Sequence, residues 1–123
     1  MPICFQRPAR GGKKQTPESA WRSTALKWLR IRYRGVMWEY RTLGNGMTRS
    51  GVPDDILIIR GIPCCIEWKR AEYKPGKNVT AQDMEIAAIR KAGGRAAKVR
   101  NWDELEALVD GIPCVQMGTG EME

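Results

Sequence analysis

Two apolar runs joined by a short turn in the middle of the chain place the strongest constraint on its fold. Residues 55–59 are almost continuously apolar after their first position, and residues 64–69 form a second, largely apolar run. Residues 60–63, which include a glycine and a proline, separate the two runs. Short apolar runs bounded by turn residues are typical of β-strands. We therefore expect a β-hairpin, with the strand over 55–59 covered on both faces.

The segments around this hairpin carry signals for three helices and two further strands. Thr16-Pro17 is a helix-start signal, Thr80 is a helix N-cap, and Asn101 with Glu104 resembles a capping box. In chain order we expect a helix over 17–33, strands over 36–42, 55–59 and 64–69, a helix over 80–92, a strand over 95–100 and a helix over 101–109. This order predicts an α/β fold with a mixed central sheet flanked by helices.

Size and composition indicate one globular domain. The 123 residues are 42% hydrophobic, which is sufficient for a core without stabilising cross-links. We expect residues 1–15 to be a flexible basic arm, residues 16–110 to form the folded domain and residues 111–123 to be a loose tail. No apolar run approaches membrane-spanning length, so we expect a soluble, cytoplasmic protein without a membrane partner.

Charge and residue usage narrow the classes of function. The formal charge is +7, which favours polyanionic partners through counterion release, although the charge could serve solubility alone. The chain has no histidine and no CxxC pair, which disfavours a zinc site and excludes a histidine-based triad or general base. We expect all four cysteines to be reduced packing residues, namely Cys4, Cys64, Cys65 and Cys114.

The parity of the hairpin brings carboxylates and a lysine onto one face of the sheet. Residues two apart on a strand share a face at roughly 7 Å, so Glu67 and Lys69 face the same way. If the hairpin turns about residues 61–62, Asp54 lies opposite Lys69 and Asp55 points away. A one-residue shift in register would instead bring Asp55 opposite Glu67. The sequence favours Asp54 without settling the choice.

This arrangement is suited to the hydrolysis of a phosphodiester. Asp54 and Glu67 can bind Mg²⁺, with waters and a substrate phosphate filling the remaining positions. Such a metal polarises the phosphoryl oxygen and lowers the pKa of a bound water. Lys69 can orient that water or offset the charge on the phosphate. The alternative is a surface salt-bridge cluster, but the strand positions and the basic chain favour the catalytic interpretation.

Further side chains could extend this site. Glu18 falls on the apolar stripe of the first helix, so we expect it to face the sheet as a metal or water ligand. An acid placed to suit the helix dipole is an equal alternative. Gln82 lies in the first turn of the second helix, where it could also be an ordinary helix residue. The best candidates for phosphate contacts are Arg49, Arg70, Lys74 and Lys77.

The tryptophans could either stack on bases or fill the core. Trp21, Trp28 and Trp38 fall on apolar stripes, so we expect them in the core. The role of Trp102, at the start of the last helix, is open at this level.

Taken together, these motifs resemble those of a known nuclease family. The similarity is to the VRR-NUC (virus-type replication-repair nuclease) domain of the PD-(D/E)xK superfamily. It covers about residues 16–110 and implies a restriction-endonuclease-like αβββαβ core. The family usually has an apolar residue after the motif aspartate, where this chain has Asp55. The matching segments are Gly-Val-Pro-Asp at 51–54, Ile-Glu-Trp-Lys at 66–69, Thr-Ala-Gln at 80–82 and Gly-Gly at 93–94.

The resemblance implies a Mg²⁺- or Mn²⁺-dependent DNA endonuclease without an organic cofactor. Short stand-alone members are typically phage or bacterial proteins, thought to act as homodimers on branched DNA such as four-way junctions. A non-catalytic DNA-binding or scaffold module that kept the fold is an alternative, and so is an RNA-directed nuclease. The residues that match the family's site are Asp54, Glu67 and the main-chain carbonyl of Trp68 as metal ligands, Lys69 as the catalytic lysine, Gln82 beside the water or metal, and Glu18 as the acid of the first helix.

Overall fold

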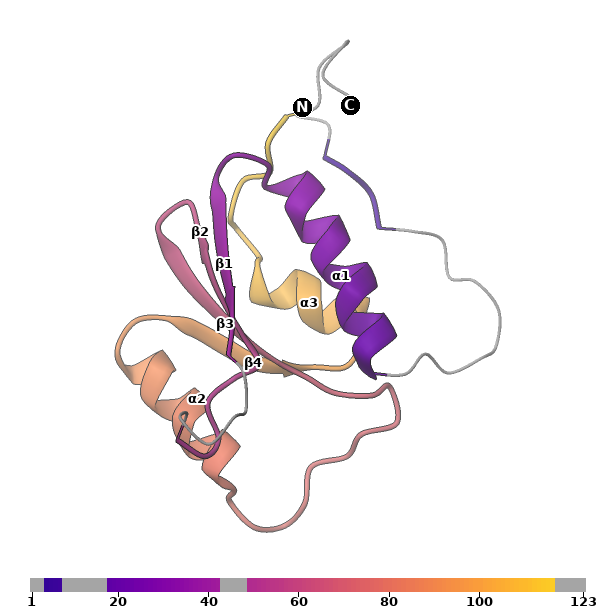
Figure 1. Ribbon diagram of the computed structural model, residues 1–123. Coiled ribbons are helices and arrows are strands. Elements are labelled where there is room, and N and C mark those ends of the chain that lie inside the picture. The colour runs from indigo at the N-terminus through magenta and orange to yellow at the C-terminus, as the bar shows by residue number, and fades with distance from the viewer. Residues whose placement is uncertain (1–3, 8–17, 43–48, 117–123) are drawn as a thin grey trace.

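The computed structural model describes residues 4–7, 18–42 and 49–116, which form three helices and four strands (Figure 1). The expected order of elements is confirmed in this part of the chain, while the Thr16-Pro17 helix start lies outside it. The elements are α1 (Glu18–Arg32), β1 (Met37–Arg41), β2 (Asp55–Ile59), β3 (Ile62–Trp68), α2 (Ala81–Lys91), β4 (Arg95–Val99) and α3 (Trp102–Leu108).

The strands form one open mixed sheet in the order β1-β2-β3-β4. β2 is antiparallel to both β1 and β3, whereas β3 and β4 are parallel. The β2–β3 turn consists of Arg60 and Gly61, which both have positive φ (48° and 83°), as in the tight turns that suit twisted hairpins. Ile59 consequently pairs with Ile62, so the hairpin turns one residue earlier than expected.

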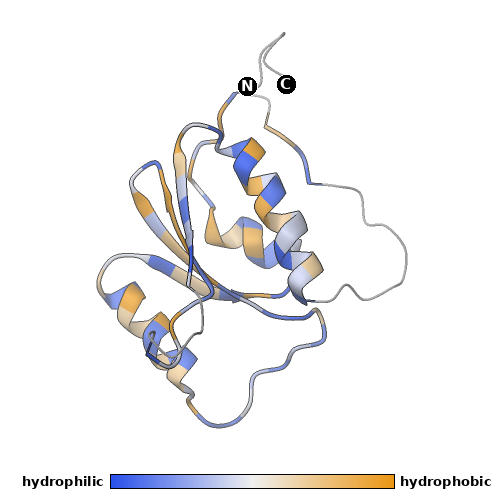
Figure 2. Cartoon of the chain, in the orientation of Figure 1, coloured by the Kyte–Doolittle hydropathy of each residue, from blue (hydrophilic) through white to orange (hydrophobic). Residues whose placement is uncertain are grey.

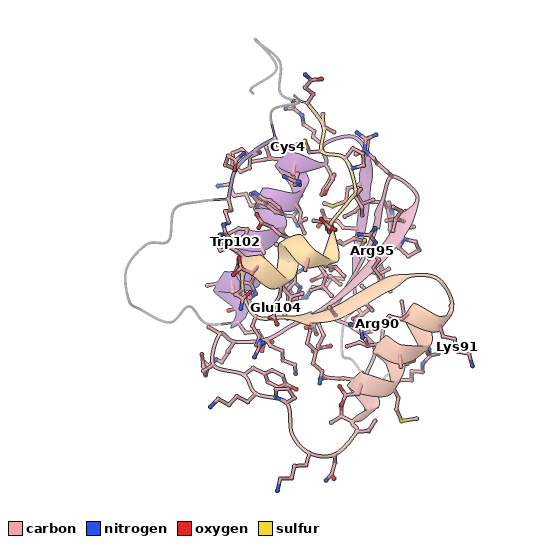
Figure 3. The ribbon with its side chains drawn as sticks, turned by 180° about the vertical axis from the view of Figure 1, so that it is seen from behind. Cys4, Arg90, Lys91, Arg95, Trp102 and Glu104 are labelled. Atoms are coloured by element: carbon pink, nitrogen blue, oxygen red, sulfur yellow. A yellow bond between two sulfur atoms is a disulfide. The ribbon has the colours of Figure 1, made fainter. Side chains whose placement is uncertain are left out.

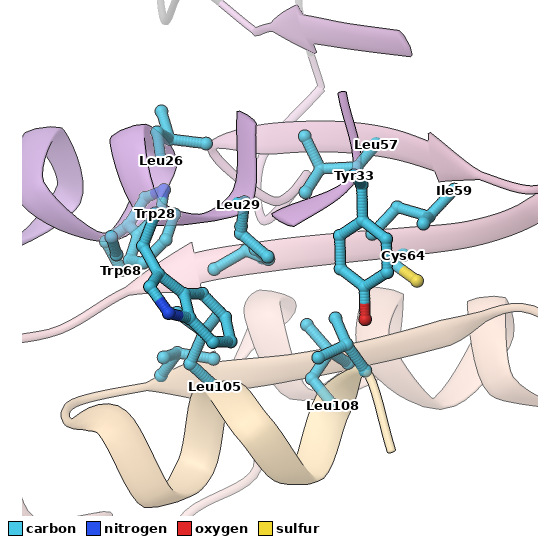
Figure 4. Close-up of a cluster of buried hydrophobic side chains, with 14 of the residues drawn as sticks. Leu26, Trp28, Leu29, Tyr33, Leu57, Ile59, Cys64, Trp68, Leu105 and Leu108 are labelled. Carbon is cyan, nitrogen blue, oxygen red and sulfur yellow. The ribbon is translucent and has the colours of Figure 1, made fainter. Parts of the chain in front are cut away.

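One face of the sheet carries the main hydrophobic core, against which α1 and α3 pack (Figures 1 and 4). Hydrophobic and hydrophilic residues alternate along α1, as expected for a helix that covers a sheet (Figure 2). Fully buried core side chains come from helices and strands alike: Leu26, Trp28, Leu29, Tyr33, Leu57, Ile59, Cys64, Ile66, Trp68 and Leu105.

Tryptophans form an edge-to-face cluster at one end of this core. Ring centroids are 5.9 Å apart for Trp21 and Trp68, 5.0 Å for Trp21 and Trp102, and 5.5 Å for Trp28 and Trp102. The core positions expected for Trp21 and Trp28 are confirmed, and Trp102 joins them. The expectation for Trp38 is wrong, because its side chain lies on the opposite face of the sheet and is 56% exposed.

The opposite face is only partly covered. α2 packs there through Ile86 against Cys65 and Ala96, with Ile56 and Ile89 at the margin. The β1–β2 end of this face remains open, and the side chain of Ile58 on β2 is 41% exposed. The expectation that β2 is covered on both faces is therefore wrong, since α2 is placed over β3 and β4.

Residues 4–7 and 112–116 are joined to each other and to α1. Cys4 and Cys114 form a disulfide, with their Cα atoms 5.9 Å apart, which corrects the expectation of four reduced thiols (Figure 3). The Trp28 indole donates to the carbonyl of Phe5 at 3.1 Å, and the amide of Val115 donates to the carbonyl of Arg32 at 2.8 Å. Residues 4–7 and 112–116 are thus anchored, which corrects the flexible arm and loose tail expected for these positions. Within the described residues, no helix combines the length and apolarity needed to cross a membrane.

Candidate active site

The hairpin brings Asp54 and Glu67 together at one end of the sheet. The β2–β3 register pairs Asp55 with Ile66, so its next step places Asp54 opposite Glu67, whereas the sequence predicted Lys69 as its partner. The backbone amide of Trp68 donates to Asp54 Oδ2 at 3.0 Å, which fixes the carboxylate against β3. The expectation that Asp54 shares the face of Glu67 is confirmed, because both expected and observed registers have the same parity.

Glu67 is a buried carboxyl in a negative environment. Its exposed fraction is 6%, and burial, followed by the charge and hydrogen bonding of Asp54, raises its pKa to about 8. Lys69 opposes this shift, with its Nζ 3.9 Å from Glu67 Oε2, while Glu18 adds to it. Glu67 therefore holds a proton near neutral pH unless a cation compensates for the neighbouring carboxylate.

Asp55 points to the other face and is fully engaged there. Arg22 of α1 donates to both of its carboxylate oxygens, at 2.7 and 3.0 Å, and the Trp68 indole donates at 2.6 Å. This hydrogen bonding raises the pKa of Arg22. Asp55 is 1% exposed, so it is a buried ion-pair partner. The geometry resolves the choice that the sequence left open: Asp54, not Asp55, lies beside Glu67.

A second lysine reaches this site from β4. Lys98 is aligned with Glu67 in the parallel β3–β4 register. Its Nζ lies 2.9 Å from Asp83 Oδ1 and 2.9 Å from the hydroxyl of Tyr73. The ammonium groups of Lys69 and Lys98 lie 4.9 and 5.3 Å from the centroid of the Tyr73 ring. Lys98 and Tyr73 were not predicted from the sequence, because local patterns reveal neither the β3–β4 register nor the path of the loop that carries Tyr73.

The loop before Asp54 packs tightly against the start of α2. Gly51 has φ 89°, and a Cβ at this position would lie 2.5 Å from the carbonyl carbon of Ala81 and 2.8 Å from the amide nitrogen of Gln82. Only glycine fits this contact without displacement of backbone. The close approach brings half-buried Gln82 next to the loop that carries Asp54.

The remaining acid of the expected site lies at its edge. Glu18 is the first residue of α1 and is exposed, so the expectation that it faces the sheet rather than water is wrong. Its charge nevertheless contributes to the raised pKa of Glu67. The structure therefore places Glu18 within electrostatic range of the carboxylate pair.

The expected phosphate contacts are dispersed around the site. Arg49 forms a bidentate ion pair with Glu85 of α2. Arg70 Nη1 lies 3.7 Å from Glu72 Oε1. Lys74 and Lys77 are exposed in the loop between β3 and α2. Of the four, Arg49 has the most strongly compensated charge.

A hollow of about 640 Å³ lies elsewhere, along β4. Its arginines bind main-chain carbonyls: Arg90 Nε donates to Ala96 at 2.9 Å, and Arg95 donates to Leu108 at 2.9 Å (Figure 3). These cations therefore stabilise the packing of α2 and α3 on β4. Apart from Lys98, the hollow contains none of the site residues.

The two carboxylates offer oxygen ligands of the kind that hard divalent cations prefer. In the described residues, no three His, Cys, Asp or Glu side chains are arranged to hold a metal together. Mg²⁺ commonly binds through one or two carboxylates and keeps waters or phosphate as its other ligands. Asp54 and Glu67 fit that requirement, and a cation between them would compensate for the charge that keeps Glu67 protonated.

Comparisons with known proteins add no family assignment. No family model matches the chain, and no curated protein or solved structure matches it either. The resemblance to VRR-NUC domains consequently rests on the sequence motifs alone.

Proposed function

We propose that the protein is a Mg²⁺- or Mn²⁺-dependent endodeoxyribonuclease that hydrolyses phosphodiester bonds in branched DNA during replication, repair or recombination. The observation that carries the proposal is the buried Glu67 carboxyl beside Asp54, with Lys69 Nζ 3.9 Å away. A strongly perturbed carboxyl next to a second carboxyl and a lysine is typical of catalytic sites.

Each residue of this site has a distinct role in the proposal. Asp54, Glu67 and the main-chain carbonyl of Trp68 hold the metal, which supplies a polarised phosphate and a more acidic water when bound. The amide of Trp68 keeps Asp54 oriented through its 3.0 Å hydrogen bond. Lys69 stabilises the negative charge that develops on the phosphate. Lys98, anchored by Asp83, adds a second positive charge on the same side.

The outer residues complete the site. Gln82 lies in the first turn of α2, beside the loop of Asp54, where it helps to place the water or metal. The net charge of +7 and the exposed Lys74 and Lys77 favour a nucleic-acid backbone as substrate. Paired cuts in a four-way junction need two sites, and a twofold homodimer is the simplest way to supply them.

The experiment is a cleavage assay on four-way junctions, flaps and plain duplex, in Mg²⁺, Mn²⁺ or EDTA. We expect metal-dependent cutting that prefers branched DNA and that falls at least about 1000-fold in Glu67→Gln, which corresponds to roughly 4 kcal/mol of transition-state stabilisation. Glu106→Gln, an exposed acid on α3, is the matched control and should cut like the wild type.

Two results would contradict the proposed site or the proposed activity. Cutting that survives in both Glu67→Gln and Asp54→Asn contradicts the assigned site. Salt-sensitive DNA binding that is indifferent to EDTA and gives no cleavage under any condition would identify a non-catalytic binding module instead.

A further inference from the structure

Two aromatic side chains lie stacked and exposed on the open part of the sheet. Trp38 and Tyr40 of β1 have ring centroids 6.1 Å apart and ring planes within 4° of parallel. They are 56% and 55% exposed. Ile58, the partner of Trp38 on β2, extends this surface and is 41% exposed. We call these three residues the aromatic platform. Exposed large apolar side chains that cluster in this way usually mark a binding surface.

The platform lies on the same face of the sheet as the carboxylate pair. Residues directly opposite on antiparallel strands share a face, and Tyr40 pairs with Ile56, which packs on the α2 side. The amide of Thr42 donates to the carbonyl of Asp54 at 2.9 Å, so Tyr40 is a diagonal neighbour of Asp54. Diagonal neighbours are about 7–8 Å apart. The aromatic rings therefore begin next to the residues of the proposed reaction and extend away along β1.

The charges around the platform suit an anionic strand. Glu39, the acid between the two aromatic residues, is turned to the other face, where it pairs with Arg30 at 2.8 Å. Lys69 of the neighbouring site supplies a cation on this face, with its Nζ 3.9 Å from Glu67 Oε2. The arginines before and after β2 are engaged elsewhere, because Arg49 pairs with Glu85 and Arg60 donates to the carbonyl of Pro113 at 2.8 Å. Flat aromatic rings next to cations are the recurring combination in proteins that bind single-stranded nucleic acid.

We propose that the aromatic platform stacks an unpaired nucleobase of the DNA strand whose phosphate enters the Asp54–Glu67 site. This inference rests on the proposed nuclease function, and it accounts for how a domain of this size distinguishes branched DNA from plain duplex. Duplex bases are already stacked on each other, whereas junctions and flaps offer bases that can leave the stack at a moderate cost.

The test measures binding of a single-stranded oligo(dT) 20-mer and of a blunt duplex by fluorescence anisotropy in EDTA, where cleavage is blocked. Alanine substitution of a stacking residue typically weakens binding about 5- to 150-fold, so we expect Trp38→Ala and Tyr40→Ala to lose at least fivefold for the single strand. Duplex affinity should stay within twofold. Trp38→Phe and Tyr40→Phe keep a ring and should retain most of the affinity.

Two further measurements separate base stacking from general apolar adhesion of the oligonucleotide. Met84→Ala removes another exposed apolar side chain, on α2 and outside the platform, and should bind like the wild type. Trp38 is the most exposed of the described tryptophans, so oligo(dT) should quench the intrinsic fluorescence of the wild type and much less that of Trp38→Phe.

The inference is overturned if the alanine variants bind the single strand like the wild type, or if they lose duplex affinity to the same extent. It is also overturned if binding is lost only together with a change of oligomeric state in sedimentation, because the platform is then a contact between copies of the chain. Binding in EDTA without cleavage in Mg²⁺ would retain the platform and reject the nuclease. Cleavage by the wild type without platform-dependent binding would do the reverse.

Discussion

On the α1/α3 face of the sheet the buried acid is Asp55, held by Arg22 and by the indole of Trp68. On the α2 face the buried acid is Glu67, which lies beside a second carboxylate, with Lys69 Nζ 3.9 Å from its Oε2. The first acid has its charge compensated within the fold. The second has a pKa raised to about 8, which indicates that the fold leaves its charge uncompensated.

This difference separates two adjacent aspartates that the sequence makes look equivalent. Strand alternation sends Asp54 and Asp55 to opposite faces, one into a set of side chains suited to binding and the other into an ion pair with α1. The charge of Asp55 is balanced by Arg22, so this ion pair stabilises the packing of α1 on the sheet. Glu67 lies beside a second acid, so its ionised form requires a further cation to balance the charge.

The largest expected change in stability comes from substituting Asp55, the aspartate on the α1/α3 face. Asp55→Asn leaves the Arg22 guanidinium, whose side chain is 19% exposed, without its anion. Loss of one partner of a buried pair costs about 3–5 kcal/mol, and the partial exposure of Arg22 favours the lower end of that range. For a domain of this size we expect thermal unfolding to shift down by roughly 10 °C.

Asp54→Asn is the matched variant. It keeps an oxygen that can accept from the amide of Trp68 and removes the charge that opposes ionisation of Glu67. Its stability should equal or exceed that of the wild type, while metal-dependent cleavage is lost. If calorimetry finds Asp54→Asn the more damaging of the two to stability, the contrast between the two faces is wrong.

The sequence predicts most of this fold because its signals are local. Apolar runs, turn residues and the Thr80 and Asn101 caps identify the elements, and the parity of the hairpin favours Asp54 over Asp55. The alignment of Lys98 with Glu67 depends on the register between β3 and β4, which are separated by a loop and a helix. Such a register is set by the packing of α2 and has no local signature.

Two other errors have the same origin. Cys4 and Cys114 lie 110 residues apart, so only the folded chain brings their Cα atoms within disulfide distance. The alternation around Trp38 is typical of a half-buried strand. Nothing in that segment shows that α2 covers β3 and β4 and leaves β1 exposed. Local patterns thus assign a residue to a face, while the distribution of helices over that face decides whether it is buried.

The disulfide also distinguishes the two faces of the sheet, because the segments that it joins pack against the core on the α1/α3 side only. Disulfides stabilise by typically about 2–4 kcal/mol, mainly by restricting the unfolded chain, and more for long loops such as this one, whose cysteines are 110 residues apart. We expect dithiothreitol to lower the unfolding free energy of the wild type by about this amount in urea titrations. Cleavage at room temperature should continue, since the carboxylate pair lies on the other face.

The double variant Cys4→Ser/Cys114→Ser is the control for this measurement. It should match the reduced wild type and show no further response to dithiothreitol, because Cys64 and Cys65 are the free cysteines and are buried. A wild type whose stability is unchanged by reductant would mean that packing of Phe5 and Ile112, not the cross-link, anchors the chain ends.

The most direct probe of the uncompensated face is the pH dependence of Glu67→Gln. Burial and Asp54 raise the pKa of Glu67 above its ordinary value, so the folded protein binds this proton more tightly than the unfolded chain does. The associated stability is complete below about pH 4.5 and is lost as the pH rises through about 8. Glutamine is neutral at every pH, so the stability of the variant relative to the wild type should increase between about pH 4.5 and pH 8.

One pKa unit corresponds to about 1.4 kcal/mol, so the gain in unfolding free energy should grow by up to about that amount with each pH unit between about 4.5 and 8, measured by thermal unfolding in EDTA. Glu106→Gln, the exposed control, should show no such trend. Added Mg²⁺ should stabilise the wild type at pH 8 and leave Glu67→Gln unchanged, because only the ionised carboxylate binds the cation. A gain that stays constant between pH 5 and pH 8 would mean that Glu67 is already ionised without a metal. In that case the two faces of the sheet would not differ in how they compensate their buried acids.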